Sequence, residues 1–210
     1  MKESELANII IEYYEKQDYI IYKEVTAKGS KSGGKARADI IMEKNGIYTG
    51  IETKISFGLK VIQQAFTWKE KTNFIYICIP KSKMTSMKRF GYSICVDYGI
   101  GIIEVDKKNN VHIVNDPIIN KNPSLPKLYE EHKSGEAGVS SEYITPFKIT
   151  KNKIMNYIND NGKSLLTDMV KNIDHHYKND NSGKQSILKL IRIGVIQLEL
   201  TKVKGKYYLE

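Results

Sequence analysis

Cysteine, histidine and tryptophan are scarce in this chain of 210 residues, which contains two cysteines, four histidines and one tryptophan. Cys78 and Cys95 each lie inside a short apolar run, so we expect buried free thiols in a reducing compartment. The sequence has no cysteine and histidine spacing typical of zinc ligands. These absences argue against a disulfide-stapled secreted domain and against a zinc finger.

Long hydrophobic runs are also missing from the sequence. No apolar run is long enough to cross a bilayer, and the first residues carry acidic side chains without the apolar centre of a signal peptide. We therefore expect an intracellular, cytoplasmic protein that does not contact a membrane.

Positive charge exceeds negative charge, with 33 Lys and Arg against 24 Asp and Glu and a net charge of +9. The excess favours a polyanionic partner such as nucleic acid. It is unevenly distributed, because residues 148–210 hold twelve Lys and Arg and six Asp and Glu, which is +6 of the total. Since 40% of the residues are hydrophobic, the chain can also bury a core.

The first half of the chain alternates between helical and strand patterns. Asn45-Gly46 between two apolar runs predicts a two-residue hairpin turn, so the segment with Glu52 pairs antiparallel with the segment that carries Asp39. Apolar spacing predicts a helix over about residues 4–16, strands over 19–25 and 38–43 around a Gly- and Ser-rich loop over 28–35, a helix from about 59 to 71, and strands over 74–80, 92–96 and 99–105. We expect an α/β fold in which helices flank a mixed central sheet.

Proline is rare as well, and four of the five prolines fall between residues 117 and 146. We predict one domain over residues 1–116, an irregular connection over 117–147 and a second domain over 148–210. In the last of these, the patterns predict helices over 151–159, 164–177 and 182–193 and a hairpin of strands 197–202 and 206–209 around Lys204-Gly205. Three helices and a two-stranded hairpin describe a small winged helix-turn-helix domain.

Two carboxylates and an ammonium group occupy the predicted hairpin. Asp39 lies thirteen residues before Glu52, and side chains alternate along a strand, so Glu52 and Lys54 share one side. The carboxylates of Asp39 and Glu52, with the carbonyl of Thr53, are hard oxygen ligands of the kind that Mg²⁺ prefers. Lys54 would orient the attacking water, stabilise the transition state or, if desolvated, act as a base. The pattern indicates a metal-dependent phosphodiesterase.

With Arg37-Ala38-Asp39, Ile51-Glu52-Thr53-Lys54 and Gln64-Ala65-Phe66-Thr67-Trp68, residues 3–105 resemble the PD-(D/E)XK nuclease superfamily, whose fold is restriction-endonuclease-like. The resemblance implies Asp39 and Glu52 as ligands of Mg²⁺, or of Mn²⁺ in its place, and Lys54 as the catalytic lysine. It also implies a catalytic role for Gln64, the glutamine of a Gln-x-x-x-Tyr element in which Trp68 here replaces the tyrosine.

The superfamily often takes a further acidic metal ligand from its first helix or strand. Glu5 and Glu24 are the two candidates in this chain. A different interpretation of Glu5 is that an acid in a first helical turn complements the helix dipole and needs no metal.

Candidate DNA contacts lie in both halves of the chain. Lys31 and Lys35, in the basic loop that leads to Asp39, could contact the DNA backbone. In the winged helix, the third helix would enter the major groove and the wing would meet phosphates. The residues concerned are Lys184, Gln185 and Lys189 on the helix and Lys202, Lys204 and Lys206 on the wing.

The sequence therefore predicts an Mg²⁺-dependent DNA endonuclease that the winged helix positions on double-stranded DNA, in restriction, phage or mobile-element DNA processing. The domain order is similar to that of the end-cleaving subunit of heteromeric transposases. A homodimer is expected if both strands are cut. Two alternatives remain open, namely a DNA-binding protein or regulator with an inactive nuclease fold, and an adaptor that binds a protein partner through its last module.

Overall fold

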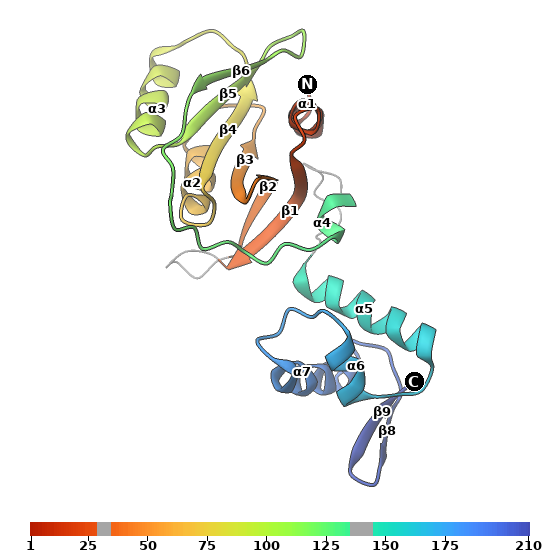
Figure 1. Ribbon diagram of the computed structural model, residues 1–210. Helices are drawn as coiled ribbons and strands as arrows, with labels where there is room; N and C mark the ends of the chain where they lie inside the picture. Colours follow the sequence, from red (N-terminus) through yellow and green to blue (C-terminus); the bar gives the residue numbers. More distant parts are fainter. Residues whose placement is uncertain (29–34, 135–144) are drawn as a thin grey trace. The chain divides into compact units, whose positions relative to one another are not determined.

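The computed structural model describes residues 1–28, 35–134 and 145–210. The chain divides into two compact units, Met1–Ile144 and Thr145–Glu210 (Figure 1). No helix in these described ranges is long and apolar enough to span a membrane.

The first unit is built on a six-stranded mixed sheet. Its strands lie side by side in chain order, and the pairs β3/β4 and β4/β5 are parallel while the other neighbours are antiparallel. The strands are β1 (Ile20–Lys28), β2 (Lys35–Lys44), β3 (Ile47–Thr53), β4 (Phe74–Pro80), β5 (Gly101–Val105) and β6 (Val111–Asn115). Because β3 and β4 are parallel, their carboxyl ends meet at one edge of the sheet.

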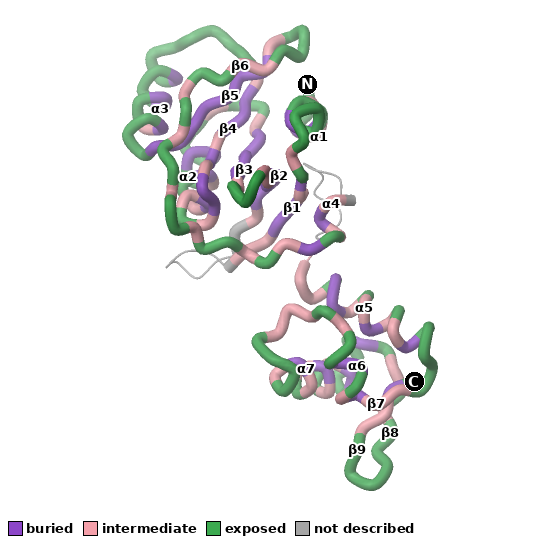
Figure 2. The backbone as a smooth tube through the Cα atoms, viewed as in Figure 1, coloured by how far each residue is buried: buried purple, intermediate pink, exposed green. Residues whose placement is uncertain are grey.

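Helices cover both faces of this sheet (Figures 1 and 2). On one face α1 (Glu3–Glu15) packs Leu6 and Ile10 against Ile51 of β3. On the other face α2 (Leu59–Trp68) and α3 (Ser86–Asp97), which connect the parallel strands, pack against Ile77 of β4. The central strands are thus buried on both faces, as their continuous apolar runs require.

The hairpin between β2 and β3 forms at Asn45-Gly46. Both residues have positive φ, 53° and 76°, which is the backbone of a type I′ turn. The register pairs Lys44 with Ile47 and continues to Ile40 and Ile51. The predicted antiparallel pairing of the two motif strands is confirmed.

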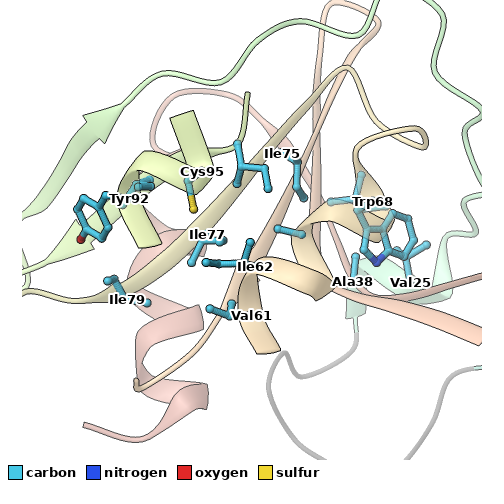
Figure 3. Close-up of a cluster of buried hydrophobic side chains, with 14 residues drawn as sticks. Val25, Ala38, Val61, Ile62, Trp68, Ile75, Ile77, Ile79, Tyr92 and Cys95 are labelled. Atoms are coloured by element: carbon cyan, nitrogen blue, oxygen red, sulfur yellow. The ribbon is translucent and has the colours of Figure 1, made fainter. Parts of the chain in front are cut away.

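Trp68 lies in the core of the α2 face and is almost fully buried. Figure 3 shows its ring beside Val25 and Ala38 at one end of the cluster, with Tyr92 and Ile79 at the other. The aromatic side chain at this place in the motif therefore packs the sheet against α2.

The strand predicted over residues 92–96 is wrong, because this segment belongs to α3. Lys88, Gly91, Tyr92 and Cys95 are its buried residues, at spacings of three and four that belong to a helix. The Thr85 hydroxyl accepts a hydrogen bond from the Lys88 amide and caps the amino end of the helix. The apolar triplet Ile94-Cys95-Val96 has the composition of a strand but lies within a segment of helical periodicity.

Residues 117–134, within the predicted connection, belong to the first unit and pack on the rest of it. The Asn120 amide donates to the Asn73 carbonyl and the Ser124 amide to the Glu70 carbonyl. Tyr129 is buried, and the short helix α4 (Glu131–Ser134) contacts β1. Strand β6, which the sequence did not predict, precedes this segment and forms one edge of the sheet.

The second unit has the element order of a winged helix. Its elements are α5 (Pro146–Asn161), β7 (Ser164–Leu165), α6 (Leu166–Asn172), α7 (Asp180–Arg192), β8 (Leu200–Val203) and β9 (Lys206–Leu209), and its sheet has the order β7-β9-β8. Lys204 and Gly205 have positive φ and form the turn of the wing. The predicted helix over 164–177 is too long, because β7 takes its first two residues and α6 ends at Asn172. The fold class expected from the sequence is otherwise confirmed.

Candidate functional site

The register of the sheet aligns three acidic residues across three neighbouring strands. Glu24 lies between the pairs Lys23↔Ile40 and Val25↔Ala38, directly opposite Asp39. One step beyond the pair Ile40↔Ile51, Asp39 lies opposite Glu52. The hairpin therefore brings the two motif carboxylates to adjoining positions, as the sequence predicted.

Glu52 is fully buried at the carboxyl end of β3. Neither of its carboxylate oxygens has a hydrogen-bond partner among the described residues. Burial, and then the nearby Asp39 carboxylate, raise the pKa of Glu52 well above its ordinary value. A buried carboxyl group without a partner lowers the stability of the fold. A cation bound to its oxygens would offset that cost.

Asp39 is held by the residue that follows Glu52. Its Oδ2 accepts hydrogen bonds from the Thr53 amide, at 2.8 Å, and from the Thr53 hydroxyl, at 3.0 Å. Burial raises the pKa of Asp39, while these two hydrogen bonds and the Lys54 ammonium lower it. The second oxygen of Asp39, Oδ1, lies outside these two bonds.

Lys54 follows β3 directly and forms an ion pair with Glu3 of α1. Its ammonium stabilises the charged forms of both Asp39 and Glu52. The acid of the first helix that reaches the site is thus Glu3, which the sequence patterns did not single out.

Glu5 forms its hydrogen bond within the first turn of α1. Its side chain is 56% exposed, and its Oε2 accepts a hydrogen bond from the Lys2 amide at 2.7 Å. The geometry matches the alternative interpretation of Glu5, in which the acid caps the first turn of the helix.

Glu24 is buried and forms an ion pair with Arg37, whose Nε lies 2.8 Å from Oε2. The backbone of Glu24 has a φ of 55°, a left-handed conformation that a strand residue other than glycine rarely adopts. Such a conformation costs about 1–3 kcal/mol and tends to occur at functional sites. Glu24 thus lies in the acidic row, with a guanidinium beside it.

Gln64 lies on α2, which packs against β2, β3 and β4. Its Oε1 is buried and has no hydrogen-bond partner among the described residues. Gln64 and Glu52 thus both carry buried oxygen atoms that the described part of the chain leaves unsatisfied.

The donor set can be tested against the metal that the sequence implies. In the described ranges, no three Asp, Glu, His or Cys side chains come together as a preformed metal centre. Mg²⁺ is commonly held by one or two carboxylates and keeps several waters. The two unsatisfied oxygens of Glu52, Oδ1 of Asp39 and the carbonyl of Thr53 fit that mode of binding.

The predicted DNA contacts of the second unit lie on its surface. Gln185 and Lys189, four residues apart on α7, and the wing lysines Lys202, Lys204 and Lys206 are exposed, while Lys184 is half-buried. Arg192, which the sequence patterns did not single out, donates to the Tyr207 hydroxyl at 3.2 Å and connects α7 to the wing. Its position one turn after Lys189 was the available signal.

Lys31 and Lys35 are the two candidate DNA contacts of the first unit. Lys31 lies outside the described residues, and Lys35 is the first residue of β2.

Comparisons with known proteins give no family. No protein-family model matches the chain, and no curated protein matches it. Among solved structures, the chain is similar to the crystal structure of protein of unknown function AF1548, at 18% identity and a TM-score of 0.37. The match covers 47% of this chain, which spans about half, 55%, of that protein.

Proposed function

We propose that the chain is an Mg²⁺-dependent DNA endonuclease of the PD-(D/E)XK type. The observation that carries the proposal is the fully buried Glu52 carboxylate, whose two oxygens have no partner among the described residues, beside Asp39 and Lys54. A carboxylate with a purely structural role would be paired or solvated, whereas a metal-binding carboxylate has no partner until the cation binds.

The residues of the chain divide the work of phosphodiester hydrolysis. Asp39 and Glu52, with the Thr53 carbonyl, would hold Mg²⁺, and the bound ion supplies positive charge to the non-bridging phosphate oxygens. Lys54, anchored by Glu3, orients the attacking water and donates to the phosphate as negative charge develops. Gln64, on α2, would take the catalytic role that the resemblance to the superfamily implies.

The decisive experiment incubates the full chain with supercoiled plasmid and Mg²⁺, beside the variants Asp39→Ala and Lys54→Ala. We expect wild-type protein to nick or linearise the plasmid, both variants to lose cleavage by at least about a hundredfold, and EDTA to abolish it. Lys107→Ala, an exposed lysine in the turn between β5 and β6, is the matched control and should retain activity. Tight DNA binding by the wild type without cleavage under any divalent cation would instead identify a DNA-binding regulator.

We propose further that the winged helix holds this nuclease on double-stranded DNA. The support is the exposed basic surface of α7 and the wing, in the part of the chain that carries +6 of the net charge. Replacing Lys202, Lys204 and Lys206 by alanine should lower the slope of log affinity against log salt by about 0.9 for each DNA phosphate that these lysines neutralise in the wild type. Lys171→Ala, on α6 of the same unit, should leave that slope unchanged.

A further inference from the structure

A cavity of about 440 Å³ opens next to the proposed catalytic residues. Its wall begins with Ile55 and Ser56, the two residues that follow Lys54, and continues through Phe57 into α2. The far wall is formed by the carboxyl end of β4 and by α3. The cavity therefore lies at the same edge of the sheet as Glu52 and Lys54, and its volume is in the range of about 300–1,000 Å³ that is usual for small-molecule sites.

The lining is apolar and aromatic, with an exposed rim. Ile62 and Ile79 are buried beneath it, while Leu59, Met87 and Phe90 remain 73%, 75% and 61% exposed. Exposed apolar side chains of this size around a hollow mark a binding surface. Phe90, at the mouth, offers a flat ring to a ligand.

The charge of the lining has one sign. The described residues that form it include two lysines and no Asp or Glu. Lys88 is buried and paired with Glu104, at 2.6 Å, whereas Lys83 is exposed and has Ser82 beside it in the chain. An aromatic pocket with an exposed ammonium at its rim complements a ligand that has a flat apolar body and a phosphate.

We propose that this cavity binds one unpaired nucleobase of the DNA substrate, next to the phosphodiester that is cut. The inference rests on the proposed function and adds a substrate class, namely DNA with at least one nucleotide out of the helical stack at the site of cleavage. A fully paired duplex keeps its bases stacked and cannot fill the cavity without the free-energy cost of unpairing one. Phe90 would stack on the base and Lys83 would meet an adjoining phosphate.

A protein partner is the competing occupant of an apolar groove. An acidic amphipathic peptide would satisfy Lys83 and the rim residues equally well, but nothing would place it beside Glu52 and Lys54. The position of the cavity next to the site of phosphodiester chemistry favours the nucleobase.

The test measures binding of the full chain to two duplexes in EDTA, which prevents cleavage. One duplex carries a single unpaired 2-aminopurine and the other pairs the same base. We expect tighter binding and stronger fluorescence quenching with the unpaired base. Phe90→Ala should weaken binding to the unpaired duplex by about tenfold and leave the paired duplex unaffected.

Two matched variants isolate the cavity. Phe66→Ala removes an aromatic side chain that is 50% exposed on α2 but does not line the cavity, so both affinities should stay unchanged. Lys83→Ala should weaken binding to the unpaired duplex more than Lys107→Ala does.

Equal affinity for the two duplexes, or an unchanged Phe90→Ala, would overturn the proposal. Polyglutamate could also compete with the unpaired duplex for the protein. If the wild type shows this competition and Phe90→Ala does not, the proposal is overturned in favour of an acidic protein partner. Cleavage of both duplexes at equal rates in Mg²⁺ would overturn the proposed nucleobase site and support the proposed nuclease activity. A preference for the unpaired base in EDTA without any cleavage in Mg²⁺ would support the site and refute the catalytic function.

Discussion

Thr53 holds the Asp39 carboxylate with two hydrogen bonds to a single oxygen, from its amide at 2.8 Å and from its hydroxyl at 3.0 Å. Thr53 is also the neighbour of Glu52 in the chain, so one residue connects the two motif strands at the level of both carboxylates. The residue between the glutamate and the lysine of the motif is therefore more than a spacer in this protein.

Replacing Thr53 by valine should loosen Asp39 while keeping the shape of the side chain. Removing an outer partner of a metal-binding carboxylate typically costs about 10–100-fold in metal affinity or activity. We expect the Mg²⁺ concentration for half-maximal cleavage to rise by that order. Thr49→Val, a buried threonine on the same strand, is the control and should leave the Mg²⁺ dependence unchanged.

Glu52→Gln should stabilise the metal-free protein while abolishing cleavage. Burial and the Asp39 carboxylate raise the pKa of Glu52 above its ordinary value of 4.5, so the charged form destabilises the fold. The stability that the protonated form provides is fully present below 4.5 and is lost as the pH rises through the folded-state pKa. Near neutral pH in EDTA, urea denaturation should show a gain of about 1–3 kcal/mol for the variant.

Added Mg²⁺ offers the complementary measurement. It should raise the melting temperature of the wild type and not that of Glu52→Gln, because binding to the folded state alone stabilises it. A variant less stable than the wild type in EDTA would show that Glu52 is satisfied in the fold.

Glu3 and Glu5 should separate in function despite lying two residues apart. Glu3→Gln removes the partner of Lys54 and should lower kcat by about tenfold, with KM and the melting temperature little changed. Glu5→Ala removes the acceptor of the Lys2 amide, so it should cost about 0.5–1 kcal/mol of stability and leave kcat unchanged. The opposite assignment of the two effects would place Glu5 in the site.

Lys88 should be a strong determinant of stability. Its ammonium lies 2.6 Å from Glu104 Oε1, both side chains are buried, and the Tyr92 hydroxyl donates to the same oxygen at 2.7 Å. Lys88→Met would leave the Glu104 charge without its counter-ion, at a cost of about 3–5 kcal/mol in urea denaturation. Lys83→Met, at an exposed position in the loop before α3, should cost less than about 0.5 kcal/mol.

His132 should make stability fall at acidic pH. Burial lowers the pKa of its imidazole from 6.5, against the opposing effect of Glu131, and Nδ1 accepts a hydrogen bond from the Tyr129 amide at 3.2 Å. Because the unfolded chain takes up the proton first, stability is lost as the pH falls below 6.5. Wild type and His132→Gln should therefore diverge in this range, by no more than about 1.4 kcal/mol per pH unit. Parallel curves would contradict the assignment.

Local signals carried most of what the sequence could predict. Asn45-Gly46 encodes its own turn, so the pairing of Asp39 with Glu52 followed from the hairpin alone. The wing followed in the same way from Lys204-Gly205. Where one turn determines the register of two strands, their pairing can be predicted from a single sequence.

Features that depend on distant contacts were out of reach. Glu3 and Glu5 occupy the same helical turn, and which of them meets Lys54 depends on how α1 lies on the sheet. The Lys88–Glu104 pair joins a helix to a strand sixteen positions later, which no local periodicity records. The left-handed backbone of Glu24, within β1, likewise has no signal in the residue type.

The second unit buries a cluster of its own, formed by residues that include Ile154, Met169, Ile187 and Leu209. A segment that supplies its own interior can be exchanged without repacking its neighbour. Under the proposed function, replacing Thr145–Glu210 with another DNA-binding domain should therefore direct cleavage to different DNA sequences.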